Sequence, residues 1–274
     1  MIETILFVIV LYNSDYYKCN TYKTLISSQQ NPNVFICDNS RNAQLIQEPN
    51  IKYSHHPENP GLSFAYNEAA KYAQEKGYQW MLLLDQDTCF PDRILESYIH
   101  GIKSNQDIKL LAPPVCVGSG RYMSPIKLCW KFGSLSKNAP RNQIVSLHDY
   151  SPINSGICVS VDYFFKAGGY KNEVFLDYSD FQFIERLRKV SDKCFILDTE
   201  IHQEFSALVD DKDKALGRYA LFCKSLKHCD KNNMVDSLGY ALVVIKRCIS
   251  LVVKTKSTQP FFVLYKNYFS TSKI

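Results

Sequence analysis

Two carboxylates separated by one residue directly follow an apolar run. The segment LLLDQDT (82–88) supplies Asp85 and Asp87, with Gln86 between them. Side chains at positions i and i+2 of an extended segment point the same way. Two carboxylates so placed form half of a site for Mg²⁺ or Mn²⁺, whose remaining ligands would be waters and a bound diphosphate. A solvated turn followed by a helix cap explains the same residues, because FPDRILESY comes next.

A second acidic cluster occurs in FLDYSDFQFIER, which contains Asp177, Asp180 and Glu185. Asp180 lies where the segment turns helical, so its carboxylate can project into a cleft and act as a general base toward a hydroxyl group. Helix capping by Ser179 or Asp180 is the simpler alternative. His202 follows a later strand and is a candidate third metal ligand or acceptor contact, although a single histidine is more often structural.

The stretch NPGLSFAYNEAA (59–70) resembles a helix start that carries unusual residues. Asn59 and Gly61 would let the backbone and an amide approach a bound nucleotide closely, and Gly61 permits a tight turn. Asn67 could hold this loop through its amide. A helix N-terminus with a buried structural asparagine fits the pattern equally well.

Asp38 follows the apolar segment NVFIC and begins the sequence Asp38-Asn39-Ser40. Its carboxylate could accept the N3–H of a uracil or thymine ring, or it could simply cap a turn. Asn13, Asp38 and Asp85 each end a predicted strand. Because ligands of open α/β sheets bind beyond the carboxyl ends of the strands, we expect these three residues to meet at one edge.

The elements that position these residues alternate between strand and helix. We expect a helix capped by Ser14 at 15–28, a helix at 62–76 ending at Gly77, and a third at 93–103. Predicted strands lie between them, at 5–11, 33–37, 51–54, 80–84 and 110–112. This order predicts an α/β fold with an open, mostly parallel central sheet flanked by helices.

The second half of the chain is less regular. Residues 113–150 are rich in Pro, Gly, Ser and Lys, which predicts loops and short strands. Residues 154–170 predict a strand and a short helix that ends at Gly168 and Gly169, and 174–189 a loop that becomes helical. A strand at 194–197 follows. We expect one domain over 1–206 and a helical extension over 207–274.

Composition narrows the function classes. The net charge of the 274 residues is +5, but the segment from residue 212 onward holds 12 Lys or Arg against 3 Asp, a local charge of +9 that suggests an anionic contact. Ten cysteines scattered through apolar runs are typical of reduced intracellular thiols. The start, MIETILFVIVLYN, predicts a buried strand rather than a leader, and no apolar run reaches the roughly 18 residues of a membrane span.

The segment LGYALVVIKRCISLVVK (238–254) is apolar and interrupted by Lys246 and Arg247. It suits an amphipathic helix on anionic lipid, and it suits equally a helix packed on the domain or in a dimer. Glycine-rich motifs of dinucleotide-binding and P-loop proteins are absent, as is the GxSxG motif of α/β-hydrolases.

Taken together, VIVLYN, ICDNS, NPGLSFAYNEAA, LLLDQDT, NSGICVSVDYFFKAGGY and FLDYSDFQFIERLR resemble glycosyltransferase family 2, the inverting enzymes of the Rossmann-like GT-A fold. The resemblance covers about residues 3–206, and LDQDT with FLDYSDF is most similar to the bacterial rhamnosyltransferase subgroup. It implies a nucleotide-sugar half over 1–113 and an acceptor half over 114–206.

The resemblance also implies residue roles. Asp87 would bind the metal directly, Asp85 would face ribose and metal, and Asp180 would be the catalytic base, with Asp177 as the substitute because the acid that usually precedes the base is Ser179 here. The donor site would comprise Leu11, Tyr12, Asn13, Asp38, Asn39, Asn59, Gly61, Asn67, Asp85 and Gln86.

The implied activity is transfer of a sugar, best L-rhamnose from dTDP-rhamnose, to a saccharide acceptor carried on a polyprenyl diphosphate, in bacterial O-antigen or capsule synthesis. The expected place is the cytoplasm, at the inner face of the membrane, and an oligomer is compatible with the sequence. Two alternatives remain: a sugar-nucleotide nucleotidyltransferase that uses the same edge, and a non-catalytic scaffold that binds sugar nucleotide or lipid.

Overall fold

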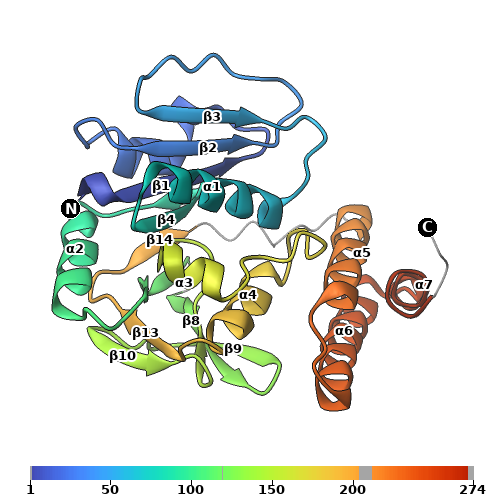
Figure 1. The fold of residues 1–274 in the computed structure, drawn as a ribbon. Helices are drawn as coiled ribbons and strands as arrows, with labels where there is room; N and C mark the ends of the chain where they lie inside the picture. The colour runs from blue at the N-terminus through green and yellow to red at the C-terminus, as the bar shows by residue number, and fades with distance from the viewer. Residues whose placement is uncertain (1, 119, 204–211, 271–274) are drawn as a thin grey trace.

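An eight-stranded sheet forms the centre of the molecule (Figure 1). The computed structural model describes residues 2–118, 120–203 and 212–270. The strand order is β10-β13-β6-β12-β4-β1-β2-β3. The strands are β1 (Ile5–Leu11), β2 (Val34–Asp38), β3 (Ile51–His55), β4 (Trp80–Asp85), β6 (Leu110–Ala112), β10 (Gln143–Ser146), β12 (Cys158–Ser160) and β13 (Lys193–Ile196).

Helices cover both faces of this sheet, which is why β1, β2 and β4 are continuous apolar runs. Leu6 and Val8 of β1 pack with α1 (Leu62–Lys76), α3 (Val161–Lys166) and α4 (Ser179–Leu187). Phe7 and Ile9 face the opposite side, which is covered by α2 (Ile94–Ser104). Strands β4, β1, β2 and β3 are parallel, as predicted, whereas β12 runs antiparallel to β4 and β6, and β10 antiparallel to β13.

The segment at 113–150 holds a longer strand than the sequence predicted, and much of it contributes to a second sheet. Its order is β11-β8-β7-β14-β5, and β9 pairs with β8. Pro125 lies inside β8, which made this nine-residue strand resemble a loop. The strands are β5 (Thr88–Cys89), β7 (Val115–Val117), β8 (Arg121–Cys129), β9 (Phe132–Ser136), β11 (Tyr150–Ser151) and β14 (Ile201–Gln203).

The prediction of an α-helix at 15–28 is wrong, because this segment forms shorter helical turns of other kinds. The segment contains a 3₁₀ turn at Tyr16–Lys18 and a π-helical turn at Tyr22–Ile26, after a first 3₁₀ turn at Ile2–Thr4. Asp15 caps the first of these two elements, in place of Ser14, by accepting a hydrogen bond from the backbone N–H of Tyr17. The backbone N–H groups of residues 20 and 21 donate to the carbonyl oxygen of Gln86, so this segment is bonded to the residue after β4 as well as within its own short turns.

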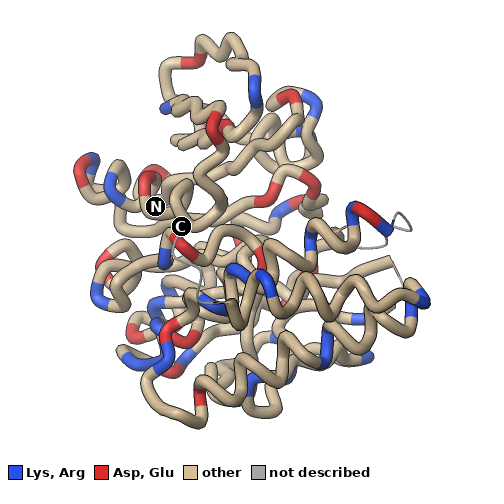
Figure 2. Tube along the Cα trace, turned by 90° about the vertical axis from the view of Figure 1, so that its right-hand side faces the viewer, with Lys and Arg blue, Asp and Glu red and all other residues tan. Residues whose placement is uncertain are grey.

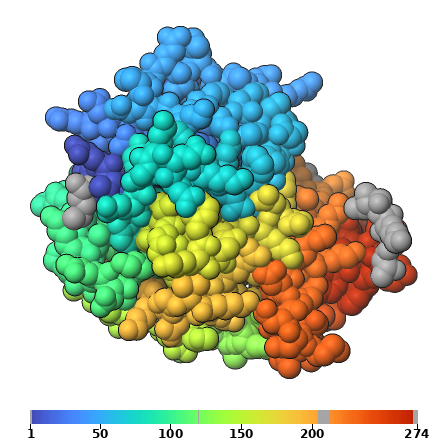
Figure 3. Space-filling model, viewed as in Figure 1, coloured from blue at the N-terminus to red at the C-terminus, as the bar shows by residue number. Residues whose placement is uncertain are grey.

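The C-terminal helices pack against the rest of the chain (Figures 1 and 3). They are α5 (Lys212–His228), α6 (Met234–Thr255) and α7 (Gln259–Leu264), followed by a π-helical turn at Tyr265–Phe269. Val174 and Tyr178, just before α4, belong to the hydrophobic core of these helices. Among the described residues, no helix combines the length and apolarity that crossing a bilayer requires. The predicted boundary at 206 lies beside 204–211, outside the described residues, and stays a prediction.

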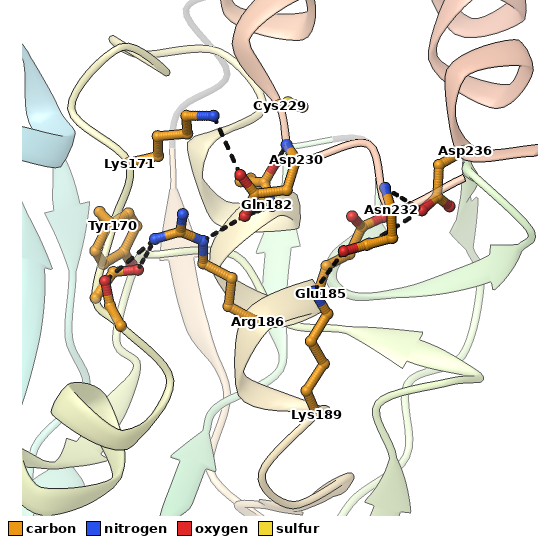
Figure 4. Close-up of polar contacts among 12 residues, drawn as sticks. Tyr170, Lys171, Gln182, Glu185, Arg186, Lys189, Cys229, Asp230, Asn232 and Asp236 are labelled. Carbon is orange, nitrogen blue, oxygen red and sulfur yellow. Dashed lines mark hydrogen bonds and ion pairs between the residues drawn. The ribbon is translucent and has the colours of Figure 1, made fainter. Parts of the chain in front are cut away.

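Asp230, in the turn between α5 and α6, fixes the C-terminal helices to α4 (Figure 4). Its carboxylate pairs with Arg186 at 2.8 Å and with Lys171 at 3.1 Å. Its backbone N–H donates to the side-chain oxygen of Gln182. Arg186 also donates to the carbonyl oxygens of Gly168 and Gly169, which joins the turn after α3 to the same cluster.

Lys131 makes a second, buried connection. Its side chain is only 4% exposed, and its Nζ lies 2.7 Å from Glu185 of α4 and 3.1 Å from Asp236 of α6. The same ammonium lies 4.3 Å from the centre of the Tyr240 ring. One cation therefore compensates two largely buried carboxylates from different elements.

Replacing Lys131 with Met is expected to lower the free energy of unfolding by about 3 kcal/mol, because Glu185 and Asp236 lose their cation while still buried. Denaturant unfolding measures this change. The matched control is Lys166→Met, which breaks an exposed pair with Asp162 and should cost less than about 0.5 kcal/mol. Equal losses in the two variants would contradict the structural role of Lys131.

Candidate active site

The bend at residues 59–61 contacts a later segment of the protein. Asn59 and Gly61 both have positive φ, at 48° and 96°. A Cβ atom on Gly61 would lie 2.4 Å from Cδ2 of Phe175, and the N–H of Leu62 donates to the carbonyl oxygen of Phe175 at 2.9 Å. Ser63 Oγ donates to the carbonyl oxygen of Val174 at 2.5 Å. The glycine therefore allows the start of α1 to contact the segment that leads to the second acidic cluster.

Asn67 supports that same segment rather than the 59–61 bend, which corrects its expected contact. Its Nδ2 donates to the carbonyl oxygen of Tyr170 and to Asn172, and its Oδ1 accepts from the N–H of Tyr170. A Cβ on Gly169 would lie 2.7 Å from Asn67 Oδ1, so glycine is also needed there. The alternative in which Asn67 is a structural asparagine accounts for these contacts.

The carboxylates of Asp85, the last residue of β4, and Asp87 approach the same side chain, although Asp87 lies in a turn rather than in the extended segment that the prediction assumed. The Nε2 of Gln203 contacts both carboxylates, at 3.2 Å from Asp85 and 3.1 Å from Asp87. Ser155 Oγ also donates to Asp85, and Tyr66 donates to its other oxygen. Burial raises the pKa of Asp85 and the nearby Asp87 adds to that effect, while the bond from Ser155 opposes it.

This acid pair fits a hard divalent cation. Two carboxylates supply oxygen ligands of the kind that Mg²⁺ and Mn²⁺ prefer. The raised pKa of Asp85 reflects burial together with the negative charge of Asp87, and a cation between them would relieve both. Asp85 and Asp87 would hold the ion.

His202 does not join this pair. Its neighbour Gln203 points toward Asp85 and Asp87, and adjacent strand residues face opposite sides. The His202 side chain is 62% exposed and its Nε2 lies 3.4 Å from Glu200. Among the described residues, the ligand atoms of Asp85, Asp87 and His202 do not form a cluster within 4.8 Å. The geometry thus gives no support to His202 as the third metal ligand.

Gln86 joins the ends of β1 and β4. Its Oε1 accepts from the N–H of Tyr12 at 2.9 Å, and its Nε2 donates to the Tyr12 carbonyl oxygen at 3.3 Å. Tyr12 itself is 55% exposed, while the Leu11 side chain is buried in the core. Asn13 has a positive φ of 51°, and its N–H donates to Ser40 Oγ. These contacts shape the edge where the donor base and ribose were expected.

Asp38 is fully buried and surrounded by protein donors. It accepts hydrogen bonds from the N–H of Ser40 at 2.9 Å and from Gln44 and Tyr53 at 2.8 Å each. Asn39 is buried beside it, and its N–H donates to the Leu11 carbonyl oxygen. Asp38 therefore organises the turn after β2, as its structural alternative proposed, and its contact with a pyrimidine base stays a prediction.

Asp180 lies in the first turn of α4 and lines a cavity of about 590 Å³. Asp85, Asp177 and Ser155 line the same cavity. Burial, with smaller contributions from the charges of Asp177 and Asp85, raises the pKa of Asp180 to about 7, against a hydrogen bond from the N–H of Phe181. Neither Ser179 nor Asp180 caps the helix, because the residue at the N-cap position is Tyr178.

Asp177 faces the C-terminal helices. Its carboxylate lies 3.2 Å from Arg218 of α5 and 3.6 Å from Arg247 of α6. It is therefore an ion-paired residue of the cavity wall, whereas Asp180, three residues later, accepts no ion pair from the described residues. This contrast favours Asp180 over Asp177 as the base.

Several residues of the site were missed by sequence reasoning. Ser155 and Gln203 stand in NSG and IHQEF, which carry no signal of contact with Asp85. Arg218 and Arg247 lie more than 200 residues after β1, within helices that had been considered for lipid contact. The basic charge of that segment was the one available clue.

Comparison with known proteins identifies the family of this chain. The model of the family described as glycosyl transferase family 2 matches residues 7–164. The dTDP-rhamnosyl transferase RfbF of Shigella flexneri is 28% identical over 186 residues, which is 63% of this chain and 59% of that protein. The matched part thus spans less than two thirds of that relative.

Two solved structures show the fold. GalNAc-T7 with UDP, GalNAc and Mn²⁺ has a TM-score of 0.57 at 12% identity, over 88% of this chain and 54% of that one. The mannosyltransferase PcManGT from Pyrobaculum calidifontis, in complex with GDP-Man and Mn²⁺, has a TM-score of 0.50 at 10% identity, over 99% and 76% of the two chains. The GT-A fold expected from the sequence is confirmed. Because the family model matches more than half of the chain, this protein belongs to glycosyl transferase family 2.

Proposed function

We propose that this protein is an inverting, metal-dependent hexosyltransferase that moves a sugar from a nucleotide diphosphate to a saccharide hydroxyl. The observation that carries the proposal is Asp180, whose carboxylate lines the same cavity as Asp85 and whose pKa is raised by burial to about 7. A base with this pKa is substantially ionised near neutral pH and still takes a proton readily.

The proposed reaction is a single displacement. Asp180 accepts the proton of the acceptor hydroxyl while that oxygen forms a bond to the anomeric carbon. The bond from that carbon to the donor phosphate oxygen breaks, and the nucleotide diphosphate leaves with the electron pair. Attack opposite the leaving group inverts the anomeric centre. Asp85 and Asp87 would hold a divalent cation, which would supply positive charge that stabilises the departing diphosphate.

The donor is proposed to be dTDP-L-rhamnose. Support comes from the 28% identity with a dTDP-rhamnosyl transferase and from the LDQDT and FLDYSDF segments. The acceptor is proposed to be a glycan on a polyprenyl diphosphate, used in surface polysaccharide synthesis at the inner face of the cell membrane. The support for a lipid-linked acceptor is the surface of the C-terminal helices.

That surface combines exposed apolar side chains with basic residues. Leu238, Leu242, Ile249 and Val253 are exposed, and their spacings of four and seven residues place them on one face of α6. Phe262 and Tyr265, in the following helical segments, are also exposed. Figure 2 looks onto these helices, where Lys and Arg outnumber Asp and Glu. Apolar area with positive charge suits an anionic bilayer surface.

Replacing Asp180 with Asn is expected to reduce kcat at least about 100-fold with near-normal donor binding, because the base is lost. In the wild type, kcat/KM should rise with pH and reach half its plateau near pH 7, where the base ionises. Steady-state kinetics over pH 5.5–8.5 measure both effects. Asp162→Asn, an exposed position, is the matched control. Retained turnover in Asp180→Asn would reject this base.

Stability separates loss of the base from loss of the fold. The pKa of Asp180 is raised by folding, so the folded state binds its proton more tightly than the unfolded state does. The stability that the folded state gains from holding this proton is therefore lost as pH rises from about 4 to about 7. At pH 8 the folded state must bury the ionised Asp180 carboxylate, and an uncharged Asn removes that cost. Asp180→Asn should therefore raise the free energy of unfolding at pH 8, by an amount on the order of 2 kcal/mol. If the variant is inactive and also less stable at pH 8, the loss of activity reflects damage to the fold rather than loss of the base.

Replacing Asp87 with Asn is expected to weaken metal-dependent donor binding about tenfold or more, because one of two charged ligands is removed. A thermal-shift panel of dTDP-, UDP- and GDP-sugars, each with Mn²⁺ or with EDTA, measures this effect and ranks the donors. Asp92→Asn is the matched control, because Asp92 is exposed in the following turn. A stabilisation by donor that persists in EDTA, or in Asp87→Asn, would contradict the metal assignment.

Flotation with liposomes tests the membrane contact. The full chain is expected to float with vesicles rich in phosphatidylglycerol and to remain behind with neutral phosphatidylcholine vesicles. Phe262→Asp should reduce the floating fraction severalfold, whereas Leu45→Asp, at another exposed apolar position, should not. Concentration-dependent dimers that Phe262→Asp dissociates, without any flotation of the wild type, would favour the dimer alternative.

A further inference from the structure

Two arginines from the C-terminal helices meet at the wall of the active-site cavity. Arg218 of α5 and Arg247 of α6 both line the cavity that contains Asp180. Both contact the carboxylate of Asp177, at 3.2 Å and 3.6 Å. Two cations share one anion, so this cluster keeps a net positive charge. Asp85 and Asp180 also line this cavity, and their charge is opposite to that of the arginine pair.

The hydrogen-bonding capacity of this pair exceeds what Asp177 uses. Arg218 Nε is buried and has no hydrogen-bond partner among the described residues, and Asp177 Oδ2 likewise receives no hydrogen bond there. A guanidinium has five N–H donors, and a buried donor without a partner is costly. The two side chains are therefore arranged for a further acceptor.

Arg247 is held in place by packing. Its guanidinium carbon lies 4.1 Å from the centre of the Phe222 ring, and Phe222 also lines the cavity. Burial lowers the pKa of Arg247, and Asp177 opposes that shift. Stacking on an aromatic ring fixes the plane of the guanidinium, and a fixed planar fork binds phosphate oxygens more specifically than a flexible lysine does.

We propose that Arg218 and Arg247 form an oxyanion site that binds a phosphate or diphosphate group of the acceptor. This inference rests on the proposed transfer to a lipid-linked glycan and names the residues that recognise its phosphate. The donor diphosphate is assigned to the Asp85 and Asp87 edge, whereas the arginines contact Asp177, three residues from the base that meets the acceptor. Phe222 and Leu251, from the same helices, add apolar surface beside the pair.

Titration calorimetry with inorganic pyrophosphate in EDTA tests the site without a metal and without turnover. The wild type is expected to bind, and Arg218→Gln and Arg247→Gln should each weaken binding about tenfold, the effect of losing one charge-assisted contact. Arg247→Lys should retain part of the affinity. Arg93→Gln, at the exposed N-cap position of α2, should bind as the wild type does. Absence of binding to the wild type, or unchanged affinity in both arginine variants, overturns the proposal.

Asp177→Asn distinguishes recognition from a merely structural ion pair. Removing the carboxylate releases both arginines, so pyrophosphate should bind several times more tightly even where the variant is less stable. A structural role alone predicts lower stability and no gain in affinity. Weaker binding in Asp177→Asn, with the fold intact by circular dichroism, contradicts the proposal.

A competition arm separates the two sources of phosphate. If the arginine pair binds the acceptor phosphate, pyrophosphate should still bind there in the presence of saturating dTDP and Mn²⁺, without EDTA. Loss of that binding assigns the pair to the donor diphosphate and overturns the acceptor assignment. Because the EDTA measurement needs no sugar transfer, failure of the proposed reaction and failure of this site give different results.

Discussion

The active site depends on the electrostatic cost of placing several carboxylates around one partly buried cavity. Asp85, Asp177 and Asp180 all line it, and each has a different set of partners. Asp85 is held by Ser155, Gln203 and Tyr66, and stands beside Asp87. Asp177 is paired with two arginines. Asp180 accepts a backbone hydrogen bond from Phe181, and no cation among the described residues contacts it. The surroundings therefore assign different tasks to chemically identical groups.

The C-terminal helices belong to this site as much as the GT-A sheet does. They provide the cationic wall of the cavity, and they can do so only because α4 is fixed to them. Asp230 is bound by Arg186, Lys171 and Gln182 (Figure 4). The buried Lys131 joins α4 to α6. The helix that carries the proposed base at its start is thus held by contacts with α6 and with the turn between α5 and α6. The position of Asp180 therefore depends on how these helices pack against α4.

Local chemistry made part of this structure predictable. The apolar runs of β1, β2 and β4 and the glycine stop after α1 follow from patterns within about 15 residues. The segment at 15–28 was mispredicted because its backbone bonds to Gln86, more than 60 residues away. Gln203 and Ser155 were missed for the same reason. Pairings set by the tertiary fold leave no local periodicity in the sequence.

The stretch NPGLSFAYNEAA illustrates how one motif can serve two needs. Its glycine was expected to bring backbone close to a nucleotide, yet the close contact that the structure describes is with Phe175. Leu62, Ser63 and Asn67 bind the backbone of residues 170–175, so α1 positions the segment that precedes Asp177 and Asp180. A helix that begins at the predicted donor side therefore also sets the position of the proposed base. The proposed displacement requires the acceptor hydroxyl, beside the base, to attack the anomeric carbon from the face opposite the leaving diphosphate, so a shared rigid support for donor and base suits this chemistry.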